Sequence, residues 1–241
     1  MALRPWNGLA IQPSSEPLCP LPAELLRLEP HPYSALGAPY GAAAGPFQLR
    51  QGVIERLLMA QASLQRLRPE WRLAIFDGWR PVAVQAFMVE HTIRQRCAEL
   101  GLDPDAASPA REAVEVEVAR FWAPPSPDPL SPPPHSTGAA VDLTLADQSG
   151  LELAMGSPID ALGAVSEPDH FGALAQRSVD QQQRQEALLW HGRRALLRQV
   201  MEASGFAQHP NEWWHFSWGD QLWAWRTAQP AAFYGRVEPV V

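Results

Sequence analysis

The most informative stretch of the chain is residues 134–145, which read Pro-His-Ser-Thr-Gly-Ala-Ala-Val-Asp-Leu-Thr-Leu. Apolar residues alternate with smaller or polar ones over Ala139–Leu145, and this period of two predicts a strand with one apolar face. Asp142 then points away from the apolar face, and Gly138 allows the chain to reverse after His135. A loop histidine and a strand carboxylate can therefore approach one point.

Patterns on both sides of this stretch predict helices around the strand. Apolar residues at spacings of three and four indicate helices at 53–67, 86–100, 110–121 and 181–204. The inward face of the last helix is expected to consist of Leu189, Leu196, Val200 and Ala203. A short buried strand is expected at 72–76. Proline excludes a helix from the loop at 124–134. Residues 1–47 are expected to be extended or looping and to cover another part of the protein.

Composition and charge define the class of protein. The chain has 241 residues, 46% hydrophobic and 19% charged, which is typical of a globular protein, and one domain over 1–241 is the simplest organisation. Acidic residues number 26 against 19 Lys and Arg, and the net charge of −7 disfavours a nucleic-acid partner. Because there is no apolar leader and no apolar run of about 18 residues, we expect a soluble, cytoplasmic protein without a membrane partner.

Several side chains could hold a metal. Cys19 and Cys97 form no CxxC pair, so the donors would be nitrogen and oxygen. A hydrolytic zinc site needs three protein ligands and one open position, and His135, Asp142 and His215 supply the three ligands. This predicts one zinc ion per chain.

Two further residues could take part in hydrolysis. Glu212 precedes His215 by three positions, so on a continuous strand the two side chains would face opposite ways. Glu212 is therefore expected in the loop before the strand, where it could act as a base toward water. Arg80 follows a short buried strand, and its guanidinium could stabilise an oxyanion.

Each of these residues alone also has a simpler interpretation. A lone histidine near aromatic residues is more often packed in the core, and an arginine after a strand more often forms a surface ion pair. Glu212 could be a solvated residue at the strand end. His209 competes with His215 for a ligand role, although Pro210 favours a loop there. It is the combination that favours a metal site.

Four motifs connect the chain to a known family. They are Phe76-Asp77-Gly78-Trp79-Arg80-Pro81, His135-x-x-Gly138-x-Ala140-x-Asp142-Leu143-Thr144-Leu145, Met155-Gly156-Ser157-Pro158-Ile159-Asp160, and Met201-Glu202-x-Ser204-Gly205-Phe206 followed by Glu212-Trp213-Trp214-His215. In these motifs the chain resembles the D-alanyl-D-alanine dipeptidases related to the vancomycin-resistance dipeptidase, zinc peptidases of the D-Ala-D-Ala metallopeptidase and hedgehog group. The resemblance spans about residues 72–220 and leaves 1–47 poorly matched.

The resemblance implies a role for each site residue. It makes His135, Asp142 and His215 the zinc ligands, Glu212 the catalytic base and Arg80 the group that stabilises the tetrahedral intermediate. Asp160 matches a position that contributes to the pocket for the free substrate amine. The family often has serine two residues before the first histidine, where this chain has Pro133, which puts the preferred dipeptide in doubt.

The resemblance also implies the fold and the activity. It implies an α+β domain with a mainly antiparallel central sheet, flanking helices and a zinc-binding cleft. The expected activity is zinc-dependent hydrolysis of D-alanyl-D-alanine, or a close D,D-dipeptide, from cell-wall peptidoglycan metabolism. Two alternatives stay open: a D-Ala-D-Ala carboxypeptidase acting on peptidoglycan precursors, and a non-catalytic zinc-binding module like the hedgehog-type domains. Neither the oligomeric state nor a role in resistance or recycling follows from the sequence.

Overall fold

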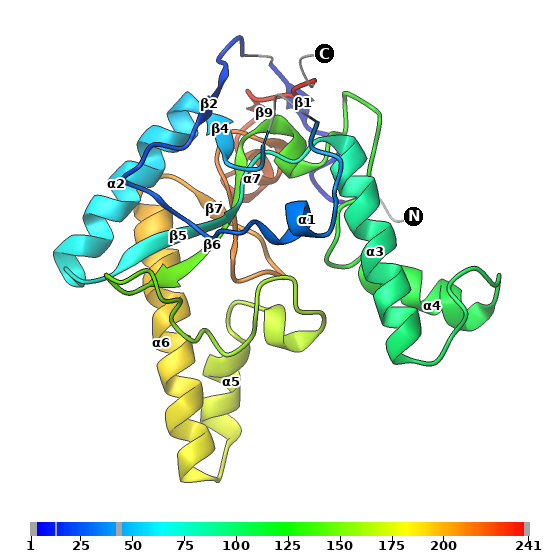
Figure 1. Ribbon diagram of the computed structural model, residues 1–241. Helices are drawn as coiled ribbons and strands as arrows, with labels where there is room; N and C mark the ends of the chain where they lie inside the picture. The colour runs from blue at the N-terminus through cyan, green and yellow to red at the C-terminus, as the bar shows by residue number, and fades with distance from the viewer. Residues whose placement is uncertain (1–3, 13, 42–44, 239–241) are drawn as a thin grey trace.

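A central sheet with helices packed around it forms the body of the molecule (Figure 1). The structure is a computed structural model, and it describes residues 4–12, 14–41 and 45–238. The strand order of the sheet is β3-β5-β6-β8-β7. Their bounds are Leu26–Arg27 for β3, Arg72–Asp77 for β5, Ala140–Ala146 for β6, His215–Ser217 for β8 and Ala207–Gln208 for β7. The α+β class expected from the sequence is therefore correct.

The central sheet is mixed, which corrects the expectation of a mainly antiparallel sheet. β3 pairs with β5 in parallel. The other three pairs, β5 with β6, β6 with β8 and β8 with β7, are antiparallel. Parallel neighbours require a crossover connection, and here the connection contains α2 (Gln51–Leu67). β3 was missed because it is two residues long and lies in 1–47, where the sequence shows no periodicity.

The strand β6 has the alternation that the sequence predicts. Val141, Leu143 and Leu145 face the main hydrophobic core, where they pack with residues of α2 and of α6 (Gln181–Ala203). Asp142 lies on the opposite face, as expected. That face is covered as well, because every residue of β6 is buried. The site residues therefore lie inside the protein, between the sheet and the segments that cover it.

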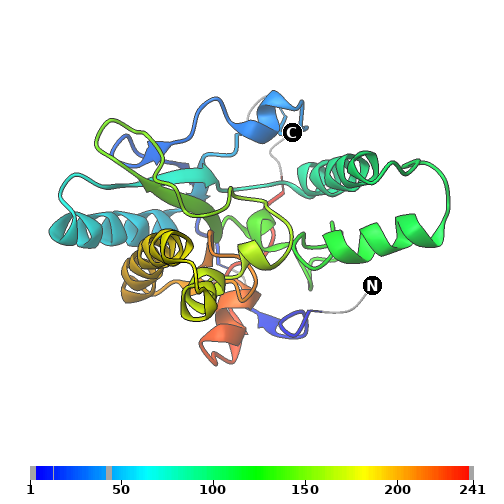
Figure 2. The ribbon, with the colours of Figure 1, turned by 90° about the horizontal axis from the view of Figure 1, so that it is seen from below.

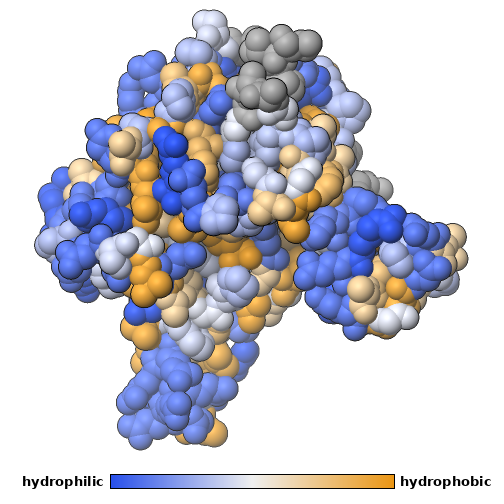
Figure 3. Space-filling model, viewed as in Figure 1, coloured by the Kyte–Doolittle hydropathy of each residue, from blue (hydrophilic) through white to orange (hydrophobic). Residues whose placement is uncertain are grey.

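Two helical arms extend from this body (Figure 1). One contains α3 (Val82–Glu99) and α4 (Pro109–Val118), and the other contains α5 (His170–Arg177) and α6. The end of the α5–α6 arm is hydrophilic in Figure 3, where residues 181–186 of α6 are all exposed. The inward face predicted for α6 was partly wrong: Leu189 and Ala203 are exposed, and Leu197 and Met201 face the core instead.

The N-terminal region consists of short elements that cover the sheet. These are β1 (Ala10–Ile11), β2 (Leu18–Pro20) and α1 (Pro32–Ala35); β1 pairs with β9 (Ala231–Ala232), and β2 pairs with β4 (Gln48–Arg50). This agrees with the covering segment expected at 1–47, of which 1–3, 13 and 42–44 lie outside the described residues. The remaining elements are the short helices η1 (Pro134–Thr137), η2 (Ala164–Ser166) and α7 (Gln221–Arg226).

In the described part of the chain, no helix combines the length and the apolar character needed to cross a membrane. The single domain over 1–241 stays a prediction.

Candidate active site

Asp142 and His215 occupy neighbouring positions on one face of the sheet. They are direct partners in the register of β6 and β8, and Asp77 on β5 pairs with Asp142 from the other side. The three side chains therefore form a row across three strands. His135 joins them from η1, which ends at Gly138 with a left-handed φ of 70°. This conformation favours glycine and turns the chain directly into β6.

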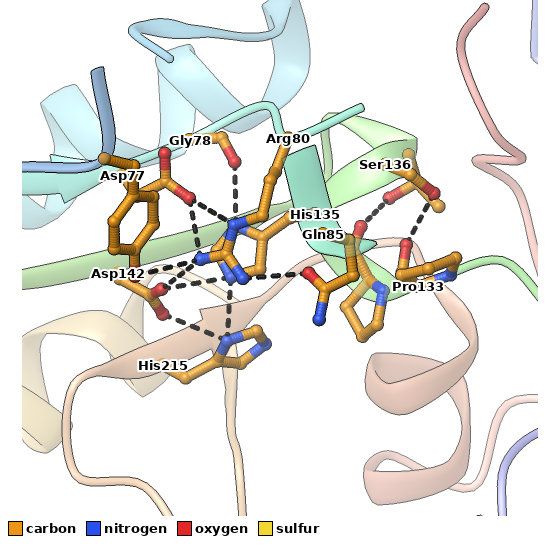
Figure 4. A network of polar contacts seen from close by, with 12 residues as sticks. Asp77, Gly78, Arg80, Gln85, Pro133, His135, Ser136, Asp142 and His215 are labelled. Carbon is orange, nitrogen blue, oxygen red and sulfur yellow. Dashed lines mark hydrogen bonds and ion pairs between the residues drawn. The ribbon is translucent and has the colours of Figure 1, made fainter. Parts of the chain in front are cut away.

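The two histidines and Asp142 point toward one another (Figure 4). The Nε2 atom of His135 lies 3.2 Å from Oδ2 of Asp142 and 3.1 Å from Nδ1 of His215. The same Nδ1 of His215 lies 3.0 Å from Oδ1 of Asp142. The three residues are buried, and their donor atoms all lie within 4.8 Å of one another. The structure thus brings together the three residues expected to hold a metal.

Hydrogen bonds orient both imidazole rings for metal binding. Nδ1 of His135 lies 2.7 Å from the carbonyl oxygen of Gly78, which can only accept, so this nitrogen carries the proton and Nε2 presents its lone pair. On His215, Nε2 lies 3.3 Å from the hydroxyl of Ser217, and Nδ1 faces the cluster. Such partners of the second ring nitrogen are typical of metal-binding histidines.

The donor set fits zinc. A tetrahedral ion about 2.0–2.1 Å from each donor holds the donors about 3.3 Å apart, close to the spacing of the three atoms here. Two imidazole nitrogens and a carboxylate, with no thiolate among them, are the kind of ligands found in catalytic zinc sites. An ion at this point would also separate two nitrogen lone pairs that otherwise face each other.

Arg80 lies beside the cluster in a dense network of buried contacts. It donates to Asp77 (2.9 Å from Nε), to Gln85 (2.9 Å from Nη1) and to Asp142 (3.2 Å from Nη2). Its guanidinium also lies over the rings of Tyr33 and Trp122. Burial alone would lower the pKa of Arg80, but Asp77 and the other anionic neighbours outweigh it and raise this pKa well above the usual value.

Asp77 holds Arg80 in place and is itself held by two residues of the N-terminal region. His31 Nε2 lies 3.1 Å from Asp77 Oδ1, and the Tyr40 hydroxyl donates to the same oxygen at 3.0 Å. Asp77 is completely buried. The orientation of Arg80 therefore depends on the Asp77 carboxylate, which His31 and Tyr40 contact in turn.

Glu212 lies in the loop before β8, as its spacing from His215 predicts. Its carboxylate oxygens are 3.7 Å from Nδ1 of His215 and 3.5 Å from Nδ1 of His209. Burial, reinforced by the negative charge of Asp142, raises the pKa of Glu212 well above its usual range. A buried carboxyl with a raised pKa next to the cluster holds a proton more readily than an exposed one, which suits it to proton transfer.

Asp160 lines the same cavity as the cluster, Arg80 and Glu212. Its backbone has a left-handed φ of 64°, and its Oδ2 accepts a hydrogen bond of 2.6 Å from the Tyr33 hydroxyl. Desolvation and the charge of Asp142 raise the pKa of Asp160 to about 7.

His209 lies between β7 and β8, and its ring centroid is 5.4 Å from that of His215. Burial, reinforced by His215, lowers the pKa of His209 well below its usual value, which disfavours a charged ring. Among the described residues, the group that could hold a metal does not include His209.

Comparisons with known proteins bear on this arrangement. A profile of the family described as D-ala-D-ala dipeptidase, peptidase M15, matches residues 27–232. The chain belongs to this D-Ala-D-Ala dipeptidase family. Family membership confirms the resemblance that the sequence motifs show, and with it the expectation of a peptidase.

Proteins named D-alanyl-D-alanine dipeptidase are similar to this member of the family. The one from Synechocystis sp. is 44% identical over 244 residues, covering 98% of each chain. The one from Escherichia coli K12 is 36% identical over 60% of this chain and 54% of its own length. A crystal structure of a vancomycin-resistance D,D-pentapeptidase variant, VanY, in complex with Zn(II), aligns over 88% of both chains with a TM-score of 0.42 and 12% identity.

Three site residues of this D-Ala-D-Ala dipeptidase family member were missed in the sequence: His31, Tyr33 and Tyr40. All three are buried around Asp77 and Arg80, and they come from the region that was treated as a cover. The region shows no apolar period, because its residues contribute single side chains rather than a repeating face. Only the cluster of one histidine and two tyrosines within ten residues could have drawn attention to it.

Proposed function

We propose that the protein is a zinc-dependent dipeptidase that hydrolyses D-alanyl-D-alanine, or a close D,D-dipeptide, to free D-amino acids. The observation that carries the proposal is the buried cluster of His135, Asp142 and His215 with Glu212 beside it, in a member of the D-Ala-D-Ala dipeptidase family. The Synechocystis relative named D-alanyl-D-alanine dipeptidase matches along 98% of this chain, which supports the substrate class.

His135, Asp142 and His215 would hold the zinc ion. Their donor atoms and spacing fit it, and the hydrogen bonds from His135 to Gly78 and between His215 and Ser217 support their orientation. When bound, zinc supplies a Lewis acid that polarises a peptide carbonyl and makes water more acidic. The protein residues around it must therefore move protons and stabilise charge.

Glu212 would be the general base and then the general acid. Its carboxylate lies on the side of the cluster next to His215. From there it could accept a proton from a water molecule held at the cluster. The raised pKa allows Glu212 to keep the proton it removes from water and to deliver it to the leaving amine. General acid–base catalysis of this kind contributes about 10²–10⁴-fold in rate.

Arg80 would stabilise the negative charge that develops on the carbonyl oxygen. Its guanidinium lines the cavity and is fixed by Asp77 and Gln85, so little reorganisation is needed when the charge forms. Asp160, on the same cavity wall, would bind the free amine of the dipeptide as a carboxylate. An ion pair between the Asp160 carboxylate and the substrate amine favours a substrate with a free amino terminus.

A hydrolysis assay tests the proposal directly. Purified protein loaded with zinc should release D-alanine from D-Ala-D-Ala, whereas an N-acylated tripeptide ending in D-Ala-D-Ala should be cleaved far more slowly. Faster cleavage of the tripeptide would favour the carboxypeptidase alternative. Folded, zinc-loaded protein that cleaves neither compound would favour the non-catalytic binding module.

The cytoplasmic location and the origin of the substrate in the cell wall also belong to this proposal. Cell fractionation tests the first, and the D,D-dipeptide content of cells lacking the protein tests the second.

A further inference from the structure

Arg4 reaches the active-site cavity from the N-terminal segment, outside the range matched by the family profile. Its Nη2 donates to the carbonyl oxygens of Ala119 and Trp122, both at 3.1 Å, and its Nη1 lies 3.4 Å from Nε2 of His209. Trp6 is buried and packs edge-on against the His209 ring. The guanidinium is thus fixed in the wall of the cavity rather than extended into solvent.

The N-terminal segment is held in this position by two parts of the chain that are far from it in sequence. Trp6 packs against Trp225 of α7, with ring centroids 5.3 Å apart, and the side chain of Gln221 donates to the carbonyl oxygen of Leu9. Figure 2 shows the segment beside α7. Folding of the segment therefore completes the cavity wall on this side.

The two guanidiniums of the cavity differ in their partners. Arg80 is paired with the carboxylates of Asp77 and Asp142. Within residues 4–12, 14–41 and 45–238, by contrast, no carboxylate lies within ion-pair distance of Arg4. The hydrogen-bond partners of Arg4 are two carbonyl groups and the ring of His209. Glu212 acts on the charge of Arg4 from farther away, but burial still lowers the pKa of Arg4, so its positive charge has no direct counter-ion in the described residues.

Such a charge favours an anionic ligand. A partly buried cation without a counter-ion is costly, and the cost is relieved when an anion binds. Nη1 uses one of its two hydrogens toward His209, and neither the other hydrogen nor Nε has a partner among the described residues. Guanidinium groups bind carboxylates well with such pairs of N–H donors.

A free dipeptide carries a carboxylate as well as an amine. Asp160 is available for the amine, whereas Arg80 is already paired with the carboxylates of Asp77 and Asp142 and is assigned to the carbonyl oxygen of the scissile bond. We propose that Arg4 is a specificity-determining residue that binds the terminal carboxylate of the dipeptide. This inference rests on the proposed function and adds to it the group that recognises the other end of the substrate.

The test compares D-Ala-D-Ala with its C-terminal amide, which has no negative charge at that end. The wild-type protein should prefer the acid, and Arg4→Met should reduce kcat/KM for the acid about 10- to 100-fold, mainly through KM, with little change for the amide. Arg4→Lys should restore part of the preference. Arg120→Met is the matched control, because Arg120 is exposed nearby and does not line the cavity.

The outcomes separate this inference from the proposed function. If wild-type protein cleaves the acid and Arg4→Met keeps the full preference for it over the amide, the carboxylate role of Arg4 is wrong while the dipeptidase activity stands. If wild-type protein cleaves neither compound, the dipeptidase proposal fails. Calorimetric titration of both compounds into zinc-loaded wild-type and Arg4→Met protein then decides the inference: weaker binding of the acid alone supports it, and equal binding overturns it.

Discussion

Asp142 and His215 lie directly opposite each other on β6 and β8, with Oδ1 of the first 3.0 Å from Nδ1 of the second. Strand register alone therefore fixes two of the three candidate ligands, because cross-strand partners in antiparallel strands share one face of the sheet. Only His135 must be positioned by other means, through η1 and the turn at Gly138. A site built in this way is nearly complete before any ion binds.

Removal of one cross-strand partner should abolish zinc binding. In His215→Ala the remaining His135 and Asp142 provide two donors, fewer than a catalytic zinc site requires. We expect less than one tenth of the wild-type zinc content after dialysis, measured by atomic emission on folded protein. The matched control is His91→Ala, since His91 lies on α3 outside the cluster. Stoichiometric zinc in His215→Ala would contradict the assignment of this ligand.

Substitution of Glu212 should separate catalysis from metal binding. In Glu212→Gln the side chain keeps its shape but cannot remove a proton from water, so kcat should fall about 10²–10⁴-fold while zinc content stays near one per chain. Glu202→Gln, an exposed change on α6, should leave both quantities unchanged. Steady-state kinetics with D-Ala-D-Ala measure the effect. A kcat within about threefold of wild type would exclude Glu212 as the base.

The sequence was sufficient to find the cluster because its residues lie in regular patterns. The alternation around Asp142 and the offset of Glu212 from His215 each predict a position relative to a strand, and both positions are as expected. The C-terminal ends of α2 and α3 follow similarly, the first from apolar spacing and the second from Gly101, which directly follows Leu100, the residue that caps α3. Both helices begin earlier than the spacing indicates, at Gln51 and Val82 rather than at 53 and 86.

The parts that could not be predicted depend on contacts between distant segments. β3 owes its existence to pairing with β5, and His31 owes its role to the carboxylate of Asp77, 46 residues away in the chain. Neither leaves a local pattern. On α6, Arg194 is buried on the inward face, where it donates to the carbonyl oxygens of Met155 and Val165. Because a charged residue lies on this face, the positions of apolar residues alone did not identify it.

In Arg80→Lys the side chain should keep its positive charge, but the charged group should no longer be held in one position. A lysine cannot donate at the same time to Asp77, Gln85 and Asp142 in the fork geometry of a guanidinium. If the fixed donor stabilises the oxyanion, kcat should fall about 10²–10³-fold with a smaller change in KM. Arg72→Lys, on the solvent side of the start of β5, is the control. A change confined to KM would assign Arg80 to substrate binding instead.

The raised pKa of Asp160 predicts how stability depends on pH. Its folded-state pKa of about 7 lies above the ordinary value of 3.8, so between these limits the folded protein binds more protons than the unfolded chain. The free energy of unfolding contributed by this group should therefore fall as the pH rises from about 4 to 7. In Asp160→Asn this contribution disappears. Urea denaturation of metal-free protein at several pH values should show a flatter profile for the variant, and parallel profiles would contradict the prediction.

Gly138→Ala tests how the turn between His135 and β6 supports the fold and the site. The backbone at Gly138 has a φ of 70°, and an added Cβ would collide with the side chain of Leu18 on β2. Strain of this kind costs about 1–3 kcal/mol of unfolding free energy, and relaxing it would shift His135 away from Asp142. We therefore expect a lower midpoint in urea and weaker zinc binding. Gly192→Ala on α6 is the matched control, because its Cβ would meet nothing within 4 Å and alanine favours a helix. If Gly138→Ala is as stable as Gly192→Ala and binds zinc equally well, the left-handed turn is not what positions His135.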